Sequence, residues 1–195
     1  MNVAILLPAA GASKRMRGAD KLLEDVDGAP LLLRQTRRAL ATGAHVLVTT
    51  PAGRPARSAA LAGTGAHLVP VKDPSEGIAA SLRAGIGALP EGSTALIILL
   101  PDLPDIETED LHKMMQAHAS APSRILRATA PDGTPGHPTL FPARFFKELS
   151  SLTGDSGAAD LIRNVGFVPV PLDGSRAITD LDTPEAWAAW RARQR

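Results

Sequence analysis

Residues 3–21 have the sequence VAILLPAAGASKRMRGADK, which joins an apolar run to a glycine-containing basic segment. The run from Val3 to Leu7 ends at Pro8 and is typical of a strand that is buried on both faces of a sheet. Small residues directly after such a strand let backbone N–H groups approach an anion such as a phosphate. The stretch therefore predicts an α/β protein with an anion-binding loop after its first strand.

Similar apolar runs alternate with helical patterns along the rest of the chain. Further strands are predicted at 46–48, 67–71, 95–100, 125–128, 138–141 and 167–172, the last at a sheet edge because of its prolines. Helices are predicted at 30–41, 55–61, 76–89, 108–119, 143–149 and 158–164, and from 183 onward. The alternation predicts a mostly parallel central sheet with helices on both faces, and the 195 residues suit one domain, 1–195.

Composition excludes several classes of protein. The chain has no cysteine, which excludes disulfides, thiolate zinc sites and cysteine nucleophiles. It has no apolar run of about 20 residues and no secretory signal pattern, so a cytoplasmic protein without a membrane partner is expected. The net charge of +1, with 3% aromatic residues, argues against nucleic-acid binding. The charge is uneven, because residues 1–90 hold 11 Lys/Arg and 6 Asp/Glu, whereas 91–195 hold 10 and 14.

The basic loop contains two cations suited to a phosphate chain. Arg15 offers a planar fork of donors and Lys21 a compact charge. Two well-known phosphate-binding patterns do not fit, because Ser13 stands where the dinucleotide fingerprint needs its second glycine and no glycine precedes a Lys-Ser/Thr pair. On its own, the loop is equally compatible with an ordinary solvated turn.

Carboxylates follow the most apolar strand and recur near the end of the chain. Asp102 lies just after the run 95–100, where open α/β sheets bind ligands, and a carboxylate there suits Mg²⁺. The alternative is an aspartate that starts a turn. Asp180 and Asp182 alternate in an extended segment, so they could share one face, and one of them could join Asp102 on a metal. Asp182 or Thr183 would also cap the last helix.

Five segments occur in one order: PAAGASKRM…DKLL, PDLP (101–104), GHPTLF (136–141), GDSGA (154–158) and DLDTPEAW (180–187). Together they resemble the MobA-like NTP transferases, and within them the molybdenum cofactor cytidylyltransferases most. The resemblance covers nearly the whole chain. It implies a Rossmann-like nucleotidyltransferase fold of the GT-A type, which binds an NTP with Mg²⁺ and transfers its nucleoside monophosphate to a small phosphorylated acceptor.

The resemblance also assigns roles to residues. It implies that the glycine-rich loop wraps the triphosphate, with Arg15 and Lys21 catalytic and with nucleotide contacts from Ala9, Ala10, Gly11 and Ser13. Gly77 and Ser81 match the segment that contacts base and ribose, although Gly77 could simply begin a helix. Asp102 matches the metal-binding carboxylate, and Asp180 a second one. His137 and Asp155 lie in segments that face the acceptor, although a loop histidine and a helix cap are the alternatives.

Three departures bear on the substrates. Arg17 is an apparent insertion, so that Lys21 follows Arg15 by six positions where the cytidylyltransferase pattern has five. Ala159 stands where cytidylyltransferases of the cofactor often have arginine, which weakens the case for a molybdopterin acceptor. Ala10, where guanylyltransferases tend to have glycine, favours CTP over GTP. A guanylyltransferase, a transferase for a sugar or polyol phosphate, and a nucleotide-binding protein without catalysis remain alternatives.

Overall fold

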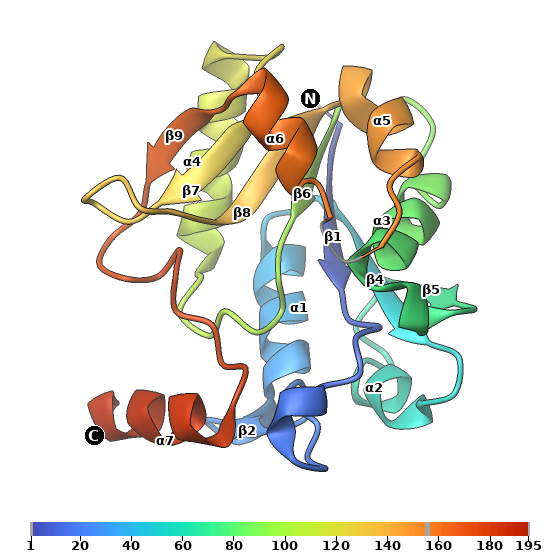
Figure 1. Cartoon of the computed structure of the whole chain (residues 1–195), viewed down its shortest axis with the longest axis vertical. Coiled ribbons are helices and arrows are strands. Elements are labelled where there is room, and N and C mark those ends of the chain that lie inside the picture. Colours follow the sequence, from blue (N-terminus) through green and yellow to red (C-terminus); the bar gives the residue numbers. More distant parts are fainter. Residues whose placement is uncertain (1, 155–156, 195) are drawn as a thin grey trace.

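The computed structural model describes residues 2–154 and 157–194 and contains a seven-stranded sheet with the strand order β5-β4-β1-β6-β8-β7-β9 (Figure 1). The strands are β1 (Val3–Pro8), β4 (His45–Pro51), β5 (His67–Val71), β6 (Ala95–Ile98), β7 (Leu126–Thr129), β8 (Pro135–Pro142) and β9 (Val168–Pro171). Each predicted strand is present, and β9 lies at an edge as its prolines predicted.

The sheet is mostly parallel, as predicted. β1 pairs in parallel with both β4 and β6, β4 with β5, and β7 with β9. Only β8 runs antiparallel to its two neighbours, β6 and β7. The turn through Asp132 and Gly133 explains this exception, since Ala130 N–H donates to the Thr134 carbonyl across it and a connection that short permits only antiparallel pairing.

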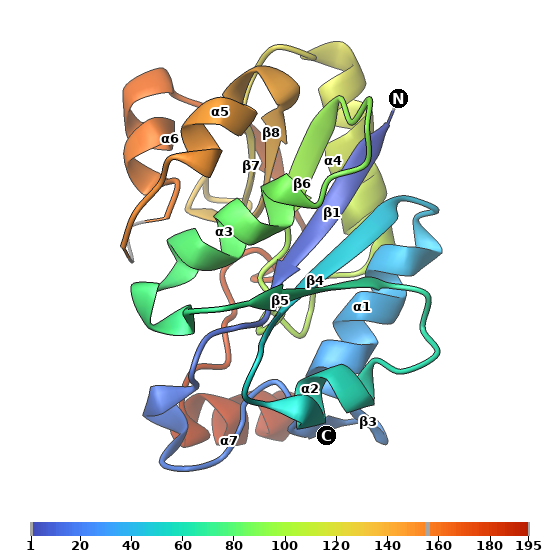
Figure 2. The same ribbon diagram turned by 90° about the vertical axis from the view of Figure 1, so that its right-hand side faces the viewer.

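Helices cover both faces of the sheet, as Figure 2 shows. One face carries α1 (Leu31–Ala41) and α4 (Thr108–Ser120), and the other carries α3 (Ile78–Gly87), α5 (Phe146–Ser150) and α6 (Ala159–Val165). The remaining elements are α2 (Pro55–Ala60), α7 (Pro184–Arg193), the hairpin of β2 (Asp25–Val26) and β3 (Ala29–Pro30), and the short 3₁₀ turns η1 (Lys14–Met16), η2 (Pro74–Glu76) and η3 (Ala143–Phe145). No helix in the described ranges is both long and apolar enough to cross a membrane.

The apolar run of β1 is continuous because both faces of that strand are buried. Ile5 and Leu7 pack in the core under α1 and α4, whereas Ala4 and Leu6 pack in the core under α3. Gly85 lets α3 lie close to β1, since a Cβ at this position would come within 2.5 Å of the Leu6 side chain. The sheet thus holds β1 firmly, and with it the start of the loop that follows.

Two helix starts refine the sequence predictions. Thr108 is the first residue of α4 and not its cap, because Glu107 and Asp110 form a capping box in which each side chain accepts from the other's backbone N–H. Thr183 caps α7 by accepting from the Ala186 N–H at 3.2 Å, which leaves Asp182 free for other contacts. The β2–β3 hairpin was not predicted, since two-residue strands carry little periodic signal.

The C-terminal arm, residues 172–194, crosses to the end of the sheet where β1 and β6 finish (Figure 1). Its α7 buries both tryptophans, Trp187 and Trp190, which lie three positions apart and so share one face of the helix. They form an edge-to-face pair with centroids 6.0 Å apart and pack against Met16 of the basic loop and Val26 of the hairpin. The arm is therefore fixed against the segment that the sequence marks as functional.

Candidate functional site

Three segments that are distant in sequence meet at the carboxyl end of β1 and β6. They are the glycine-rich loop after β1 (residues 9–21), the loop after β6 (residues 99–107), and the C-terminal arm. The Leu181 N–H donates to the Asp102 carbonyl at 3.0 Å, which fixes the arm beside the loop after β6. This edge of an α/β sheet is where ligands commonly bind.

An ion-pair network joins the three segments. Lys21 Nζ lies 2.5 Å from Asp102 Oδ2 and 2.5 Å from Asp182 Oδ1, and Arg15 Nη1 lies 2.7 Å from Asp182 Oδ2. The side chains of Lys21, Asp102 and Asp182 are largely buried, whereas that of Arg15 is 72% exposed. The structure thus brings four of the predicted polar groups together, with one cation held inside and the other reaching toward solvent.

Mutual attraction keeps the inner groups charged. Burial by itself lowers the pKa of Lys21, but the charges of Asp102 and Asp182 outweigh it and raise the pKa above its usual value. Burial likewise acts to raise the pKa of Asp182, yet Lys21 and Arg15 bring it below the usual range. For Asp180 no cation compensates, so burial and the negative charge of Asp182 raise its pKa.

The carboxylates suit a divalent cation only in part. Asp102 Oδ1 is buried and has no hydrogen-bond partner. This carboxylate oxygen is therefore left for a ligand. No group of three His, Cys, Asp or Glu side chains within 2–154 and 157–194 is arranged to hold a metal ion. Mg²⁺ often takes only one or two protein carboxylates and completes its shell with water and phosphate oxygens, and Asp102 with Asp182 or Asp180 fits that pattern.

The glycine-rich loop begins buried and becomes exposed. Ala9 and Ala10 are buried, and the Ala9 N–H donates to the Thr49 carbonyl of β4 at 2.9 Å. Gly11 is exposed, and Ser13 has a left-handed backbone with φ of 52°. The loop turns back on itself before Lys21, since Ser13 Oγ donates to Asp20 Oδ1 at 3.3 Å. Sequence reasoning missed Arg57 of α2, which is fully buried beneath this loop and bonds to it.

The start of α3 lies beside the loop. Gly77 precedes the helix with φ of 81°, a backbone that favours glycine, and Ser81 is buried in the first turns. Ala80 packs with Ala10 and Val71 in one small apolar cluster, which places this helix start next to the glycine-rich loop. The Ala79 N–H donates to the Gly154 carbonyl at 3.3 Å. Asp155, predicted to face the acceptor, lies outside the described residues.

His137 lies on β8, two residues before Thr139, which pairs with Ile98 at the carboxyl end of β6. Its Nδ1 is buried without a partner, while its backbone N–H donates to the Ala177 carbonyl at 2.8 Å. The preceding Gly136 is required by close packing, since a Cβ there would come within 1.9 Å of the Ala177 carbonyl oxygen. Burial and the charge of Arg127 lower the pKa of His137 to about 4, against the opposing effect of Asp102.

This histidine should make the protein less stable in acid. Its pKa rises from about 4 in the folded chain to 6.5 in the unfolded chain, so the folded state binds fewer protons between these values. Above pH 6.5 the histidine is neutral in both states, so the full stability of the folded chain is present. As the pH falls from 7 to 4.5, the folded state loses about 2 kcal/mol of stability, because mainly the unfolded chain binds the proton. Urea unfolding at both pH values should show a smaller loss for His137→Gln than for the wild type. An equally steep loss in that variant would contradict the assignment.

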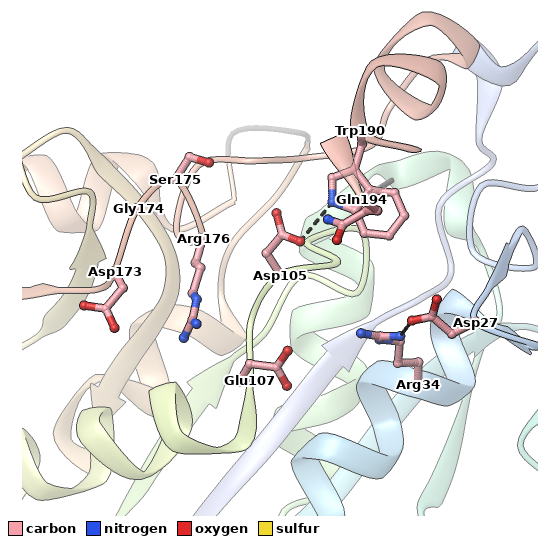
Figure 3. Close-up of a pocket in the computed structure, with 10 residues that line it drawn as sticks. All are labelled: Asp27, Arg34, Asp105, Glu107, Asp173, Gly174, Ser175, Arg176, Trp190 and Gln194. Atoms are coloured by element: carbon pink, nitrogen blue, oxygen red, sulfur yellow. Dashed lines mark hydrogen bonds and ion pairs between the residues drawn. The ribbon is translucent and has the colours of Figure 1, made fainter. Parts of the chain in front are cut away.

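A separate pocket of about 410 Å³ lies behind the arm, between α7, the start of α4 and the β2–β3 turn (Figure 3). Its floor includes the hydrogen bond from Trp190 Nε1–H to Asp105 Oδ1 at 2.9 Å. None of the predicted site residues that the structure describes lines it. The pocket therefore lies where the arm packs against the rest of the protein, and it is not the site that the sequence predicted.

Comparison with known proteins identifies the family of this chain. The MobA-like NTP transferase domain matches residues 4–170, which include β1, the glycine-rich loop, α3 and Asp102. The chain belongs to the MobA-like NTP transferase family. Family and fold together make it a nucleotidyltransferase, as the resemblance implied. The match ends before Asp180 and Asp182, so the arm that completes the ion-pair network lies beyond it.

Several solved structures share the fold of this MobA-like protein. Rv0371c from Mycobacterium tuberculosis H37Rv is 26% identical, with a TM-score of 0.85 over 97% of this chain and 98% of that chain. A manganese complex of Rv0371c gives 23% identity and a TM-score of 0.78, with 97% of each chain covered. CMP:2-keto-3-deoxy-manno-octonic acid synthetase with CTP is 17% identical, with a TM-score of 0.78 over 100% of this chain and 98% of that chain. Among curated proteins, nothing matches significantly.

Proposed function

We propose that the protein transfers a nucleoside monophosphate, with CMP preferred, from an NTP to a phosphorylated acceptor of the molybdopterin type and releases pyrophosphate. The observation that carries this proposal is the position of Lys21, which lies between Asp102 and Asp182 at the end of a glycine-rich loop. A protonated ammonium held there, with Arg15 beside it, supplies fixed positive charge where a triphosphate would enter. Residues 1–195 would act as one transferase domain.

The reaction needs no nucleophilic side chain from the protein. An oxygen of the acceptor phosphate attacks the α-phosphorus in line, the new O–P bond forms, and the bond from the α-phosphorus to the bridging oxygen of pyrophosphate breaks. Catalysis of such transfers comes mainly from positioning and charge neutralisation. Lys21 and Arg15 would offset the charge that develops on the phosphate oxygens, while loop N–H groups orient the chain of phosphates.

Mg²⁺ is the divalent cation that we propose for this site. The orphaned Asp102 Oδ1 would bind it, with Asp182 or Asp180 as the second carboxylate. A manganese complex of the structural neighbour Rv0371c supports a divalent ion in this fold. When bound, the ion would offset negative charge on the phosphate oxygens. Asp182 would have to serve both Lys21 and the ion, whereas Asp180 is hydrogen-bonded to Asp182 and would have to lose its proton to bind the ion.

The substrates are proposed from fewer observations. CTP is favoured by Ala10, and the CTP complex of the neighbouring sugar-acid synthetase supports a cytidine nucleotide in this fold. The acceptor would lie toward His137, with Asp155 as the other proposed contact. GTP as donor, and a sugar or polyol phosphate as acceptor, are the alternatives. A protein that binds nucleotides without catalysis is disfavoured, because pure binding does not require the carboxylates around Lys21.

Thermal unfolding with each of the four NTPs, with and without Mg²⁺, tests the donor. A nucleotide at a hundredfold excess over its Kd stabilises the folded state by about 2.7 kcal/mol, which for a chain of this size raises Tm by about 5–10 °C. We expect that shift with CTP and Mg²⁺ together, and little with either alone. A shift confined to GTP would transfer the proposal to guanylyl transfer.

Release of pyrophosphate separates an enzyme from a binding protein. With CTP, Mg²⁺ and a molybdopterin acceptor, the wild type should release pyrophosphate at a rate that depends on the acceptor concentration. Release with a sugar or polyol phosphate instead would keep the transferase and replace the acceptor. Binding of CTP without release for any phosphorylated acceptor would overturn the catalytic proposal.

A further inference from the structure

Arg57 is a fully buried arginine with no role in the chemistry outlined above. It lies on the short helix α2, and none of its side-chain surface is exposed. A buried guanidinium is costly unless its charge is paired and its donors are all satisfied. Its surroundings therefore reveal what the side chain is for.

All five N–H donors of this guanidinium bond to the glycine-rich loop. Nη1 donates to the Ala9 carbonyl at 2.5 Å and to the Gly11 carbonyl at 2.8 Å. Nε and Nη2 donate to the two carboxylate oxygens of Asp20 at 2.8 and 2.7 Å, and Nη2 also donates to Ser13 Oγ at 3.0 Å. One side chain thus holds the beginning, the middle and the end of the loop.

Asp20 connects this arrangement to Lys21, the next residue. Besides the arginine, its Oδ1 accepts from Ser13 Oγ at 3.3 Å and from the Leu22 N–H at 3.1 Å. Burial acts to raise the pKa of Asp20, but the bonds and charge of Arg57 outweigh it and hold the pKa below its usual value. The backbone on both sides of Lys21 is therefore fixed, which directs its ammonium toward Asp102.

The same bonds orient the backbone for an anion. In a trans peptide the C=O and N–H groups point in opposite directions. Because the carbonyls of Ala9 and Gly11 point inward to Arg57, the N–H groups of Ala10 and Ala12 point outward, and neither has an acceptor within residues 2–154 and 157–194. Ala10 is only 2% exposed and Ala12 is exposed, so these two N–H groups, directed away from Arg57, lie where the loop passes from the core to the surface, and they match the needs of a phosphate.

We infer that Arg57, through its bonds to Asp20 and the loop carbonyls, is a positioning residue that holds the glycine-rich loop ready for the triphosphate. This inference rests on the proposed function. Arg57 does not contact the nucleotide itself, since it is buried and has no donor left. Its bonds all go to residues 9–20, so its loss should affect the loop far more than the sheet.

The test compares Arg57→Met and Arg57→Lys with two controls. Arg54→Met removes an exposed arginine of the same region that donates to the Ala12 carbonyl at 3.1 Å. Leu149→Ala lowers stability through a cavity in the core beside α3 and α5, away from the loop. Arg57→Lys keeps the charge beside Asp20, so that it should fold, but offers three donors in place of a planar fork of five.

Each variant is measured for Tm, for CTP affinity in the presence of Mg²⁺, and for hydrogen exchange over residues 9–23 without nucleotide. We expect Arg57→Met to weaken CTP binding by about 100-fold, comparable to the loss that a misplacement of about 1 Å can cause in catalysis. Arg57→Lys should weaken it by about tenfold at nearly unchanged Tm, and both variants should lose exchange protection in the loop. Arg54→Met and Leu149→Ala should bind CTP like the wild type.

The outcomes separate this inference from the function on which it rests. If the wild type binds CTP and Arg57→Lys binds it as tightly, with unchanged exchange in the loop, the positioning role is overturned. If Leu149→Ala loses affinity in proportion to its lost stability, Arg57 acts through stability alone, and the role is again overturned. If the wild type binds no NTP, the proposed function fails, and the inference fails with it.

Discussion

Asp102→Asn is expected to lower kcat by about three orders of magnitude, with little change in Tm. Asparagine has the same shape, and its amide oxygen can take the place of the aspartate Oδ2 and still accept from Lys21 Nζ, which lies 2.5 Å from Oδ2. Its backbone bond to the Leu181 N–H is unaffected. What is lost is the negative charge and the basicity of Oδ1, the buried oxygen without a partner. Steady-state pyrophosphate release over a range of Mg²⁺ concentrations measures the effect.

A matched control lies in the same loop. Asp105→Asn also removes one negative charge, and the asparagine oxygen can still accept from Trp190 Nε1–H, so its activity should stay close to that of the wild type. Saturation with Mg²⁺ should move to higher concentration in Asp102→Asn and stay unchanged in Asp105→Asn. Full turnover in Asp102→Asn with an unchanged Mg²⁺ requirement would rule out Asp102 as a metal ligand.

The sequence was sufficient to predict the fold because burial is continuous along the central strands β1 and β6. The runs 3–7 and 95–100 are apolar at every position, which two covered faces demand, and the edge position of β9 followed from its prolines. The reversed direction of β8 was not predicted. Alternation of strands and helices favours parallel pairing, and only the short turn at Asp132-Gly133 reveals that β7 and β8 follow each other without a helix.

The sequence indicated the charged residues of the candidate site as members of the loops that follow two apolar strands, β1 and β6. In the structure Lys21, Arg15 and Asp102 meet, and Asp182 joins them from the C-terminal arm. Whether Asp180 or Asp182 turns inward could not be derived from an alternating pair, because that depends on how the arm docks through Trp187 and Trp190. The role of Arg57 was equally hidden, since an arginine in a short polar helix normally faces water.

Lys21→Gln is expected to lower kcat/KM for the NTP by about 10²–10³-fold, the range found when one preorganised charge or donor is removed from a transition state. The ammonium lies 2.5 Å from both Asp102 and Asp182, and their charges keep it protonated throughout the neutral range. Glutamine keeps a hydrogen-bonding group but no charge, so phosphate binding and charge neutralisation are lost together. Initial rates at varied CTP concentration measure both parts of the loss.

Lys21→Gln should strengthen metal binding, although it weakens catalysis. Without the ammonium, Asp102 and Asp182 repel each other, and a divalent cation becomes the partner that relieves this repulsion. Titration with Mn²⁺ in the absence of nucleotide should therefore show tighter binding in Lys21→Gln and weaker binding in Asp102→Asn than in the wild type. Lys14→Gln, which removes an exposed charge from the same loop, should change neither rate nor metal affinity. Equal Mn²⁺ affinity in Lys21→Gln and the wild type would mean that Lys21 and the metal do not share these carboxylates.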